Sequence, residues 1–211
     1  MSAQPSAVLS RFAPLVLALA LAAPAASAAS PGCAPTGAKL LESSGAARVY
    51  SVGTALYACL GSTRTRLGVL AGSRLAPATR VTRYALASPY VAIDTVQMGV
   101  DNFASTVSFF DLEGGGLAVA SAPAAKALPR PETFVSVTAL VMSAGGIVAW
   151  SGRSSAVGVP KPTYELWAMT AEYANRVAKG AQPFTDLKLY PVSHKLTWRT
   201  GQSGPLHQGN V

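Results

Sequence analysis

The chain has 211 residues, half of them apolar, and its 17 basic and 9 acidic side chains give a formal net charge of +8 at pH 7. This length is enough for one domain with a sizeable core. The chain has only two cysteines and two histidines, and His194 and His207 lie far in sequence from both cysteines. The composition therefore argues against a metal-binding cluster, and we expect neither a metal nor a cofactor.

Residues 1–28 have the pattern of a secretory signal peptide. A polar stretch carrying Arg11 precedes the uncharged apolar run 13–23, and residues 26–28 (Ala-Ser-Ala) match a cleavage site. We predict cleavage between Ala28 and Ala29 and a secreted protein, located outside the cell or in the cell envelope. The apolar run is shorter than the ~20 residues of a membrane span, so we expect no transmembrane segment in the mature chain. The alternative is an uncleaved N-terminal anchor.

Residues 29–45 form an N-terminal arm that contains proline, glycine and serine. Cys33 lies in this arm, and Cys59 lies in the first strong β segment. An even number of cysteines in an exported chain favours a disulfide. We therefore predict a Cys33–Cys59 bridge, with two free thiols in the core as the alternative.

Residues 46–201 consist mostly of short β-like runs divided by glycine and proline, which predicts a β-repeat domain. The expected strands lie at 48–52, 55–60, 65–70, 81–88, 90–97, 105–112, 117–121, 135–143, 147–151, 164–169, 187–190 and 196–199. Residues 202–211 are expected to form a flexible C-terminal tail.

The segment 164–179 fits two structures. Apolar side chains from Leu166 to Val177 recur at helical spacing, and Gly180 would end a helix there. Residues 164–167, however, also alternate as a strand does. We favour a strand, a turn and a second strand.

The stretch VSFFDLEGGGLAVA (107–120) places three consecutive glycines after an apolar run. A nucleotide-binding loop needs a further glycine at a fixed spacing, or a Gly-Lys-Ser/Thr sequence, and the chain has neither. We predict a β-hairpin in which Asp111 starts the turn and a glycine adopts positive φ. Phe109 and Phe110 would then lie on opposite faces of a strand that is buried on both sides.

A coarse internal repeat indicates the fold class. Its members are Leu56–Cys59, Val91–Asp94, Val148–Ser151 and Leu196–Arg199. Their irregular spacing is close to the ~40–50 residues of a four-stranded propeller blade. We predict an all-β, propeller-like fold of about three to four antiparallel blades, whose closure into a ring the sequence leaves open. An antiparallel β-sandwich is the alternative.

Five runs carry a resemblance to a known group of proteins: VYSVGTALYACL, YVAIDT, SFFDLEGG, GIVAWSG and DLKLYPVSHKLTWRTG. They are spread over about residues 49–201, and they resemble uncharacterised secreted proteins of high-GC bacteria with WD40- or TolB-like β-propeller repeats. The resemblance implies the architecture and export, and it implies no particular activity. The strands present suffice for fewer blades than most closed propellers have.

Few side chains are placed for catalysis. No G-x-S-x-G sequence is present, and His194 lies in an expected hairpin turn. A glycosidase needs two carboxylates at a defined separation, for which Asp94 and Asp101 are the nearest candidates. The alternative role for both is that of a strand-end or loop aspartate. An extracellular hydrolase acting on an envelope glycan is therefore the second functional hypothesis.

A basic stretch supports the first functional hypothesis. No acidic residue lies between Glu42 and Asp94, whereas six arginines do, and Tyr50, Tyr57 and Tyr84 lie among or beside them. Such a stretch can bind an anionic polymer or surface, and export argues against nucleic acid as that polymer. We therefore expect a non-catalytic binding module for an anionic polysaccharide or another envelope component. Its candidate binding residues are Arg64, Arg66, Arg80 and Arg83. A solvated basic face is the alternative.

Overall fold

The computed structural model of the protein describes residues 33–70, 79–100, 102–126, 132–190 and 192–211. The predicted signal peptide, its cleavage site at Ala28 and Ala29, and Asp101 lie outside these residues. The described residues form strands, turns and loops without a helix. The prediction of an all-β fold is confirmed.

The strands form four consecutive antiparallel units. Unit 1 contains β1 (Lys39–Ser44), β2 (Ala47–Val52), β3 (Ala55–Leu60) and β4 (Thr63–Val69). Unit 2 contains β5 (Thr79–Ala87), β6 (Tyr90–Met98), β7 (Phe103–Asp111) and β8 (Leu117–Pro123). Unit 3 contains β9 (Thr133–Met142), β10 (Val148–Ala156), β11 (Thr163–Met169) and β12 (Ala174–Gly180). Unit 4 contains β13 (Phe184–Tyr190), β14 (Lys195–Thr200) and β15 (Leu206–Asn210).

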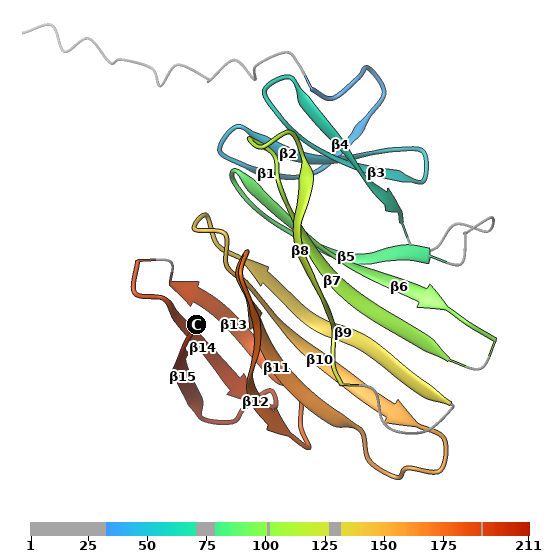
Figure 1. Cartoon of the computed structure of the whole chain (residues 1–211), viewed down its shortest axis with the longest axis vertical. Helices are drawn as coiled ribbons and strands as arrows, with labels where there is room; N and C mark the ends of the chain where they lie inside the picture. Colours follow the sequence, from blue (N-terminus) through green and yellow to red (C-terminus); the bar gives the residue numbers. More distant parts are fainter. Residues whose placement is uncertain (1–32, 71–78, 101, 127–131, 191) are drawn as a thin grey trace, which may run out of the picture.

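Within each unit, every strand pairs with the next one along the chain, as in the meander of a propeller blade. Units 2 and 3 join into one eight-stranded sheet through a single parallel bridge between Phe103 and Phe134. The four units follow one another in chain order from one end of the molecule to the other (Figure 1). Units 1 and 4 lie at opposite ends of the series in Figure 1, and among the described residues no strand of unit 1 pairs with a strand of unit 4, so the propeller-like arrangement stays open.

Three apolar cores hold the stack together, one at each junction between consecutive units. Val49 and Leu56 of unit 1 pack with Ile93 of unit 2. Phe109 of unit 2 packs with Trp150 of unit 3. At the last junction, Leu166 of unit 3 packs with Leu196 and Trp198 of unit 4. An inner unit therefore buries apolar side chains on both of its faces, as unit 2 does with Ile93 toward unit 1 and Phe109 toward unit 3.

The hairpin predicted for 107–120 is confirmed by β7 and β8. The side chain of Asp111 accepts a hydrogen bond from the Glu113 amide (2.9 Å), and its carbonyl accepts one from the Gly116 amide (2.8 Å). Gly115 and Gly116 both have positive φ, +88° and +71°. Phe109 lies in the core between units 2 and 3, and Phe110 packs against the core between units 1 and 2.

The segment 164–179 adopts the favoured arrangement of strand, turn and strand, as β11 and β12. Two other segments differ from expectation. Lys39–Ser44 of the expected arm forms β1, and Leu206–Asn210 of the expected flexible tail forms β15, paired with β14. Both are edge strands, which are held by backbone hydrogen bonds to a neighbour. Their side chains therefore do not show the alternation that identifies a half-buried strand.

The predicted disulfide is confirmed: Cys33 and Cys59 are bonded, with their Cα atoms 5.8 Å apart. The bridge attaches the chain before β1 to the third strand of unit 1. Unit 1 is the end of the stack and packs on unit 2 through one face only, so this covalent link supports a unit that lacks a second neighbour.

Gly116→Ala should lower the free energy of unfolding by about 2 kcal/mol or more, because a Cβ there would overlap the Thr65 hydroxyl in addition to straining a positive φ. Gly115→Ala is the matched control, since its Cβ would meet no atom within 4 Å. Strain alone should cost the control about 1 kcal/mol. Urea unfolding of both variants measures the difference, and equal losses would contradict the predicted contact.

Replacing both Cys33 and Cys59 with serine should lower the free energy of unfolding by about 3–4 kcal/mol, because the bridge closes a loop with a sequence separation of 26 residues. Denaturant unfolding of the double variant and of the oxidised protein checks this. A loss below about 1 kcal/mol would show that β1 and its neighbours hold the N-terminal segment without the bond.

Candidate functional site

One face of unit 1 points away from unit 2 and is covered by no other described unit. This uncovered face carries a group of aromatic and basic side chains, of which Tyr50 is fully buried. In β3, Leu56 and Ala58 point into the core, so Tyr57 and Cys59 point to the uncovered side. Strand register places further residues on the same side, and we call this surface the Tyr57 face. Its members include Arg48, Tyr50, Tyr57, Arg64 and Arg66.

Arg64 is held over a pair of stacked tyrosines. The Tyr50 and Tyr57 rings are 5.5 Å apart and inclined by 15°. The guanidinium carbon of Arg64 lies 4.2 Å from the centre of the Tyr57 ring and 5.7 Å from that of Tyr50. Burial raises the pKa of the Tyr50 phenol against the opposing charge of Arg64, and its hydroxyl donates to the Cys33 carbonyl (3.0 Å). Stacking therefore fixes an arginine that remains exposed to solvent.

Among the described residues, no carboxylate lies on the Tyr57 face to neutralise its arginines. Glu42, the acidic residue of β1, is in register with Val49 and so lies on the core side, where burial raises its pKa. Among the described residues, the ion pairs are Arg176–Glu165 and Arg199–Asp186. Arg64 and Arg66 are exposed and belong to neither pair.

The other two predicted binding arginines lie elsewhere. Arg80 and Arg83 are in β5, in register with Val96 and Asp94 of β6, on the face that meets unit 3. The Arg83 side chain reaches that unit, where its Nε donates to the Val137 carbonyl (2.9 Å). The four arginines therefore lie in two separate pairs, Arg64 with Arg66 and Arg80 with Arg83. The core between units 1 and 2 separates the two pairs.

Asp94, a predicted catalytic candidate, is completely buried. Burial raises the pKa of its carboxyl group, and Thr82, Ser105 and Arg83 partly oppose this effect. The Thr82 hydroxyl donates to its Oδ2 atom. Asp101, the second candidate, lies outside the described residues.

Arg83 borders a hollow of about 450 Å³ between units 2 and 3. We call it the arginine hollow, since Arg153 of β10 also lines it. The remaining lining residues are Thr82, Val96, Met98, Phe103, Ser136, Val137 and Thr138. Sequence reasoning missed Arg153 because it lies outside the basic stretch, and only the packing of units 2 and 3 brings it near Arg83.

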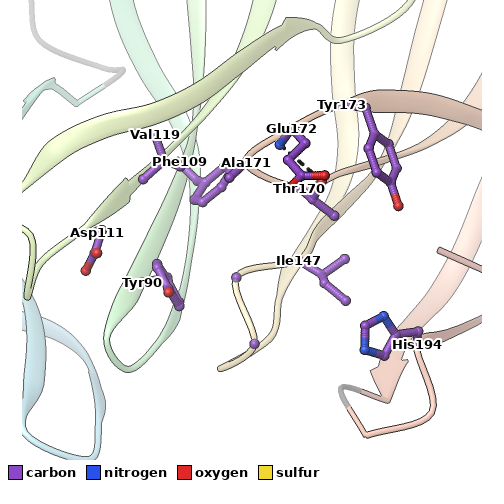
Figure 2. A pocket seen from close by; sticks show the side chains of 12 residues that line it. Tyr90, Phe109, Asp111, Val119, Ile147, Thr170, Ala171, Glu172, Tyr173 and His194 are labelled. Atoms are coloured by element: carbon purple, nitrogen blue, oxygen red, sulfur yellow. Dashed lines mark hydrogen bonds between the residues drawn. The ribbon is translucent and has the colours of Figure 1, made fainter.

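A second hollow, of about 460 Å³, lies where hairpin turns of units 2, 3 and 4 meet. Tyr90 and Phe109 form part of its wall, with their rings edge to face at 6.2 Å. Figure 2 shows Asp111 and His194 on opposite sides of this hollow, with Tyr90 and Ile147 between them. Asp111 is already engaged in its own turn, and His194 is an exposed turn residue. Among the described residues that line this hollow, His194 forms no ion pair with a carboxylate.

Glu165 is a buried carboxylate that sequence reasoning did not single out. It accepts hydrogen bonds from the Lys126 amide (2.8 Å), Trp167 Nε1 (3.2 Å) and Arg176 (2.7 Å). Burial alone would raise the pKa of Glu165, but these three donors outweigh it and hold the pKa below its ordinary value. With both oxygens bonded, Glu165 ties β11 and β12 to the segment that follows β8.

No protein-family model matches the chain, and no curated protein matches it. Among solved structures, an oligogalacturonate lyase in complex with manganese aligns with 78% of this chain and 59% of its own, at 8% identity and a TM-score of 0.31. The chain therefore spans less than two thirds of the length of that structure.

Within the ranges that the structure describes, no three or more histidine, cysteine, aspartate or glutamate side chains gather where they could hold a metal ion. The same ranges contain no helix with the length and apolar character needed to cross a membrane.

Asp94→Asn and Glu165→Gln should respond to pH in opposite directions. The folded state favours protonated Asp94, so the stability of Asp94→Asn relative to the wild type should rise from about pH 3 to about pH 7. The folded state favours ionised Glu165, so the relative stability of Glu165→Gln should fall over the same range. Denaturant unfolding at several pH values measures both trends, and parallel trends would contradict these environments.

Proposed function

We propose that the protein is an exported, non-catalytic binding module that holds an acidic polysaccharide on its Tyr57 face. The disulfide between Cys33 and Cys59 supports export, because such bonds form and persist in oxidising compartments. The net charge of the chain favours an anionic partner.

The observation that carries this proposal is the position of Arg64 over Tyr57. A guanidinium that is already held in place loses little side-chain entropy when a ligand binds, so less of the binding energy is lost in ordering it. Arg66 extends the positive charge along β4, and no carboxylate on this face competes with an acidic ligand. Leu40 and Val52, which are 56% and 40% exposed, add apolar surface beside the arginines.

A hydrolase fits the described residues less well. Two carboxyl groups have a raised pKa: Asp94 is buried and lines neither hollow, and Glu42 lies on the core side of β1. Asp111 and Glu172, which line the second hollow, belong to turns. A general acid has to reach the glycosidic oxygen. The buried carboxyl group does not meet this requirement in the structure described.

Replacing Arg64 and Arg66 with glutamine should lower the affinity for an acidic polysaccharide, such as polyglucuronate, by about tenfold or more, because two charge-assisted contacts are lost. Affinity chromatography or biolayer interferometry with the immobilised polymer measures this. Binding by the wild type should also weaken as salt is added, because the contacts are exposed to solvent.

The matched control is the pair Lys179→Gln and Lys188→Gln, which removes the same charge from exposed positions of units 3 and 4. This control should retain most of the affinity. Equal losses in both double variants would show a general effect of net charge and would refute a defined face. Tyr57→Leu, which keeps the charge and removes the ring under Arg64, should weaken binding as well.

A further inference from the structure

The second hollow lies where hairpin turns of units 2, 3 and 4 meet, and we call it the turn hollow. In an antiparallel unit, the turn between the first two strands and the turn between the third and fourth strands emerge at the same end. Units 2 and 3 contribute residues in or beside both of these turns, and unit 4 contributes His194 from its first turn. The turn hollow therefore forms only where three units are stacked.

Hydrogen bonds hold the turns that form this hollow. In the turn between β11 and β12, the Thr170 amide donates to the Tyr173 carbonyl (2.9 Å), and the Glu172 amide donates to the Thr170 hydroxyl (3.3 Å). In the turn between β9 and β10, the Gly146 amide donates to the Ser143 carbonyl (3.1 Å). The hollow is therefore built from ordered turns, and its volume of about 460 Å³ is within the range of small-molecule sites.

Two tyrosine rings line the turn hollow, on different sides of it (Figure 2). Tyr173 is 48% exposed and Tyr90 is half-buried, so both have surface that a ligand can contact. The Tyr90 ring is held in place, because Phe109 contacts it edge to face and a Cβ on Gly146 would come within 3.4 Å of it. The face of an aromatic ring carries negative charge density and attracts a cation.

Asp111 and Glu172 bring two carboxylates to the same hollow, although the chain as a whole is basic. Neither belongs to an ion pair among the described residues. One oxygen of Asp111 accepts a hydrogen bond from the Glu113 amide, and Glu172 is exposed. Among the described lining residues, His194 is the one that can carry a positive charge, and none is a lysine or an arginine. The charges that line the hollow therefore favour a cation.

The combination of rings and carboxylates favours a methylated cation. A primary ammonium group is strongly hydrated and carries three N–H donors. A quaternary ammonium group carries no donor, and it presents methyl groups and a diffuse charge that aromatic rings bind well. Val119, which is 36% exposed, adds apolar surface to the wall of the hollow.

We propose that the turn hollow binds a small quaternary ammonium ion, with its charge near Asp111 and Glu172 and its methyl groups against Tyr90 and Tyr173. None of the described lining residues belongs to unit 1, so this site is separate from the Tyr57 face. The proposed polysaccharide site and the turn hollow can therefore fail independently.

Calorimetric titration with choline and with its neutral carbon analogue, dimethylbutanol, tests the proposal, because the two molecules have the same shape and differ in charge. Choline should bind measurably, and dimethylbutanol should bind at least about tenfold more weakly. Equal affinities would show an apolar hollow without a preference for a cation and would overturn the proposal. Ethanolamine, which has the charge without the methyl groups, should also bind more weakly than choline. If it binds as tightly, the hollow is a general cation site and the proposal is wrong.

Phosphatidylcholine vesicles, tested by co-sedimentation, identify the source of the ammonium group. Vesicle binding that free choline displaces would indicate a lipid headgroup, whereas choline binding without vesicle binding would indicate a free solute. Both results support a quaternary ammonium site. Vesicle binding without choline binding contradicts it.

Two pairs of variants locate the site. Tyr173→Leu should weaken choline binding about fivefold, whereas Tyr190→Leu should not, because Tyr190 is equally exposed and is not among the lining residues. Glu172→Gln should also weaken it, whereas Glu113→Gln removes the same charge from an exposed turn residue outside the lining and should leave it nearly unchanged. All four variants should retain polysaccharide binding. Choline affinity that survives both Tyr173→Leu and Glu172→Gln, or that falls equally in the controls, would overturn the proposal.

Discussion

The structure depends on the face-to-face packing of consecutive antiparallel units. A single four-stranded unit buries little apolar surface by itself, and each of the three cores forms only where two units meet. This requirement explains the apolar residues on both faces of β7, where Phe109 and Phe110 contact different cores. It also explains why glycines are required at the turn after β7, where Gly116 lies against Thr65 of unit 1.

Because the stack stays open, its end units cannot bury both faces in this way. The outer face of unit 1 is instead stabilised locally, by a disulfide, a pair of stacked tyrosines and an arginine that covers them. These contacts leave charged groups in water while they protect the strands beneath. Because no described unit packs on the outer face of unit 1, its ordered basic surface remains available to a ligand.

Two buried carboxylates, Glu165 and Asp94, differ in the number of hydrogen bonds that they accept. Glu165 has three donors on its two oxygens, and one of them is Arg176, so its role is structural. Asp94 has one donor on one oxygen and lies beside other unpartnered atoms. The pKa values of the two groups move in opposite directions although both are buried. Hydrogen bonding, rather than burial alone, therefore sets the direction in which the pKa of each buried carboxyl group moves.

The sequence by itself determined the local features: the all-β class, the hairpin at 107–120, the Cys33–Cys59 bond and the strand pair at β11 and β12. Each depends on neighbouring residues, through alternation, turn chemistry or a single possible cysteine pairing. The edge strands β1 and β15 were not predicted, because backbone pairing leaves little trace in side chains. Only the tertiary structure decided which arginines lie together, since strand register and the stacking of units set the side to which each points. Arg153 and Arg83 line the same hollow at a junction of two units, and no spacing along the chain encodes that proximity.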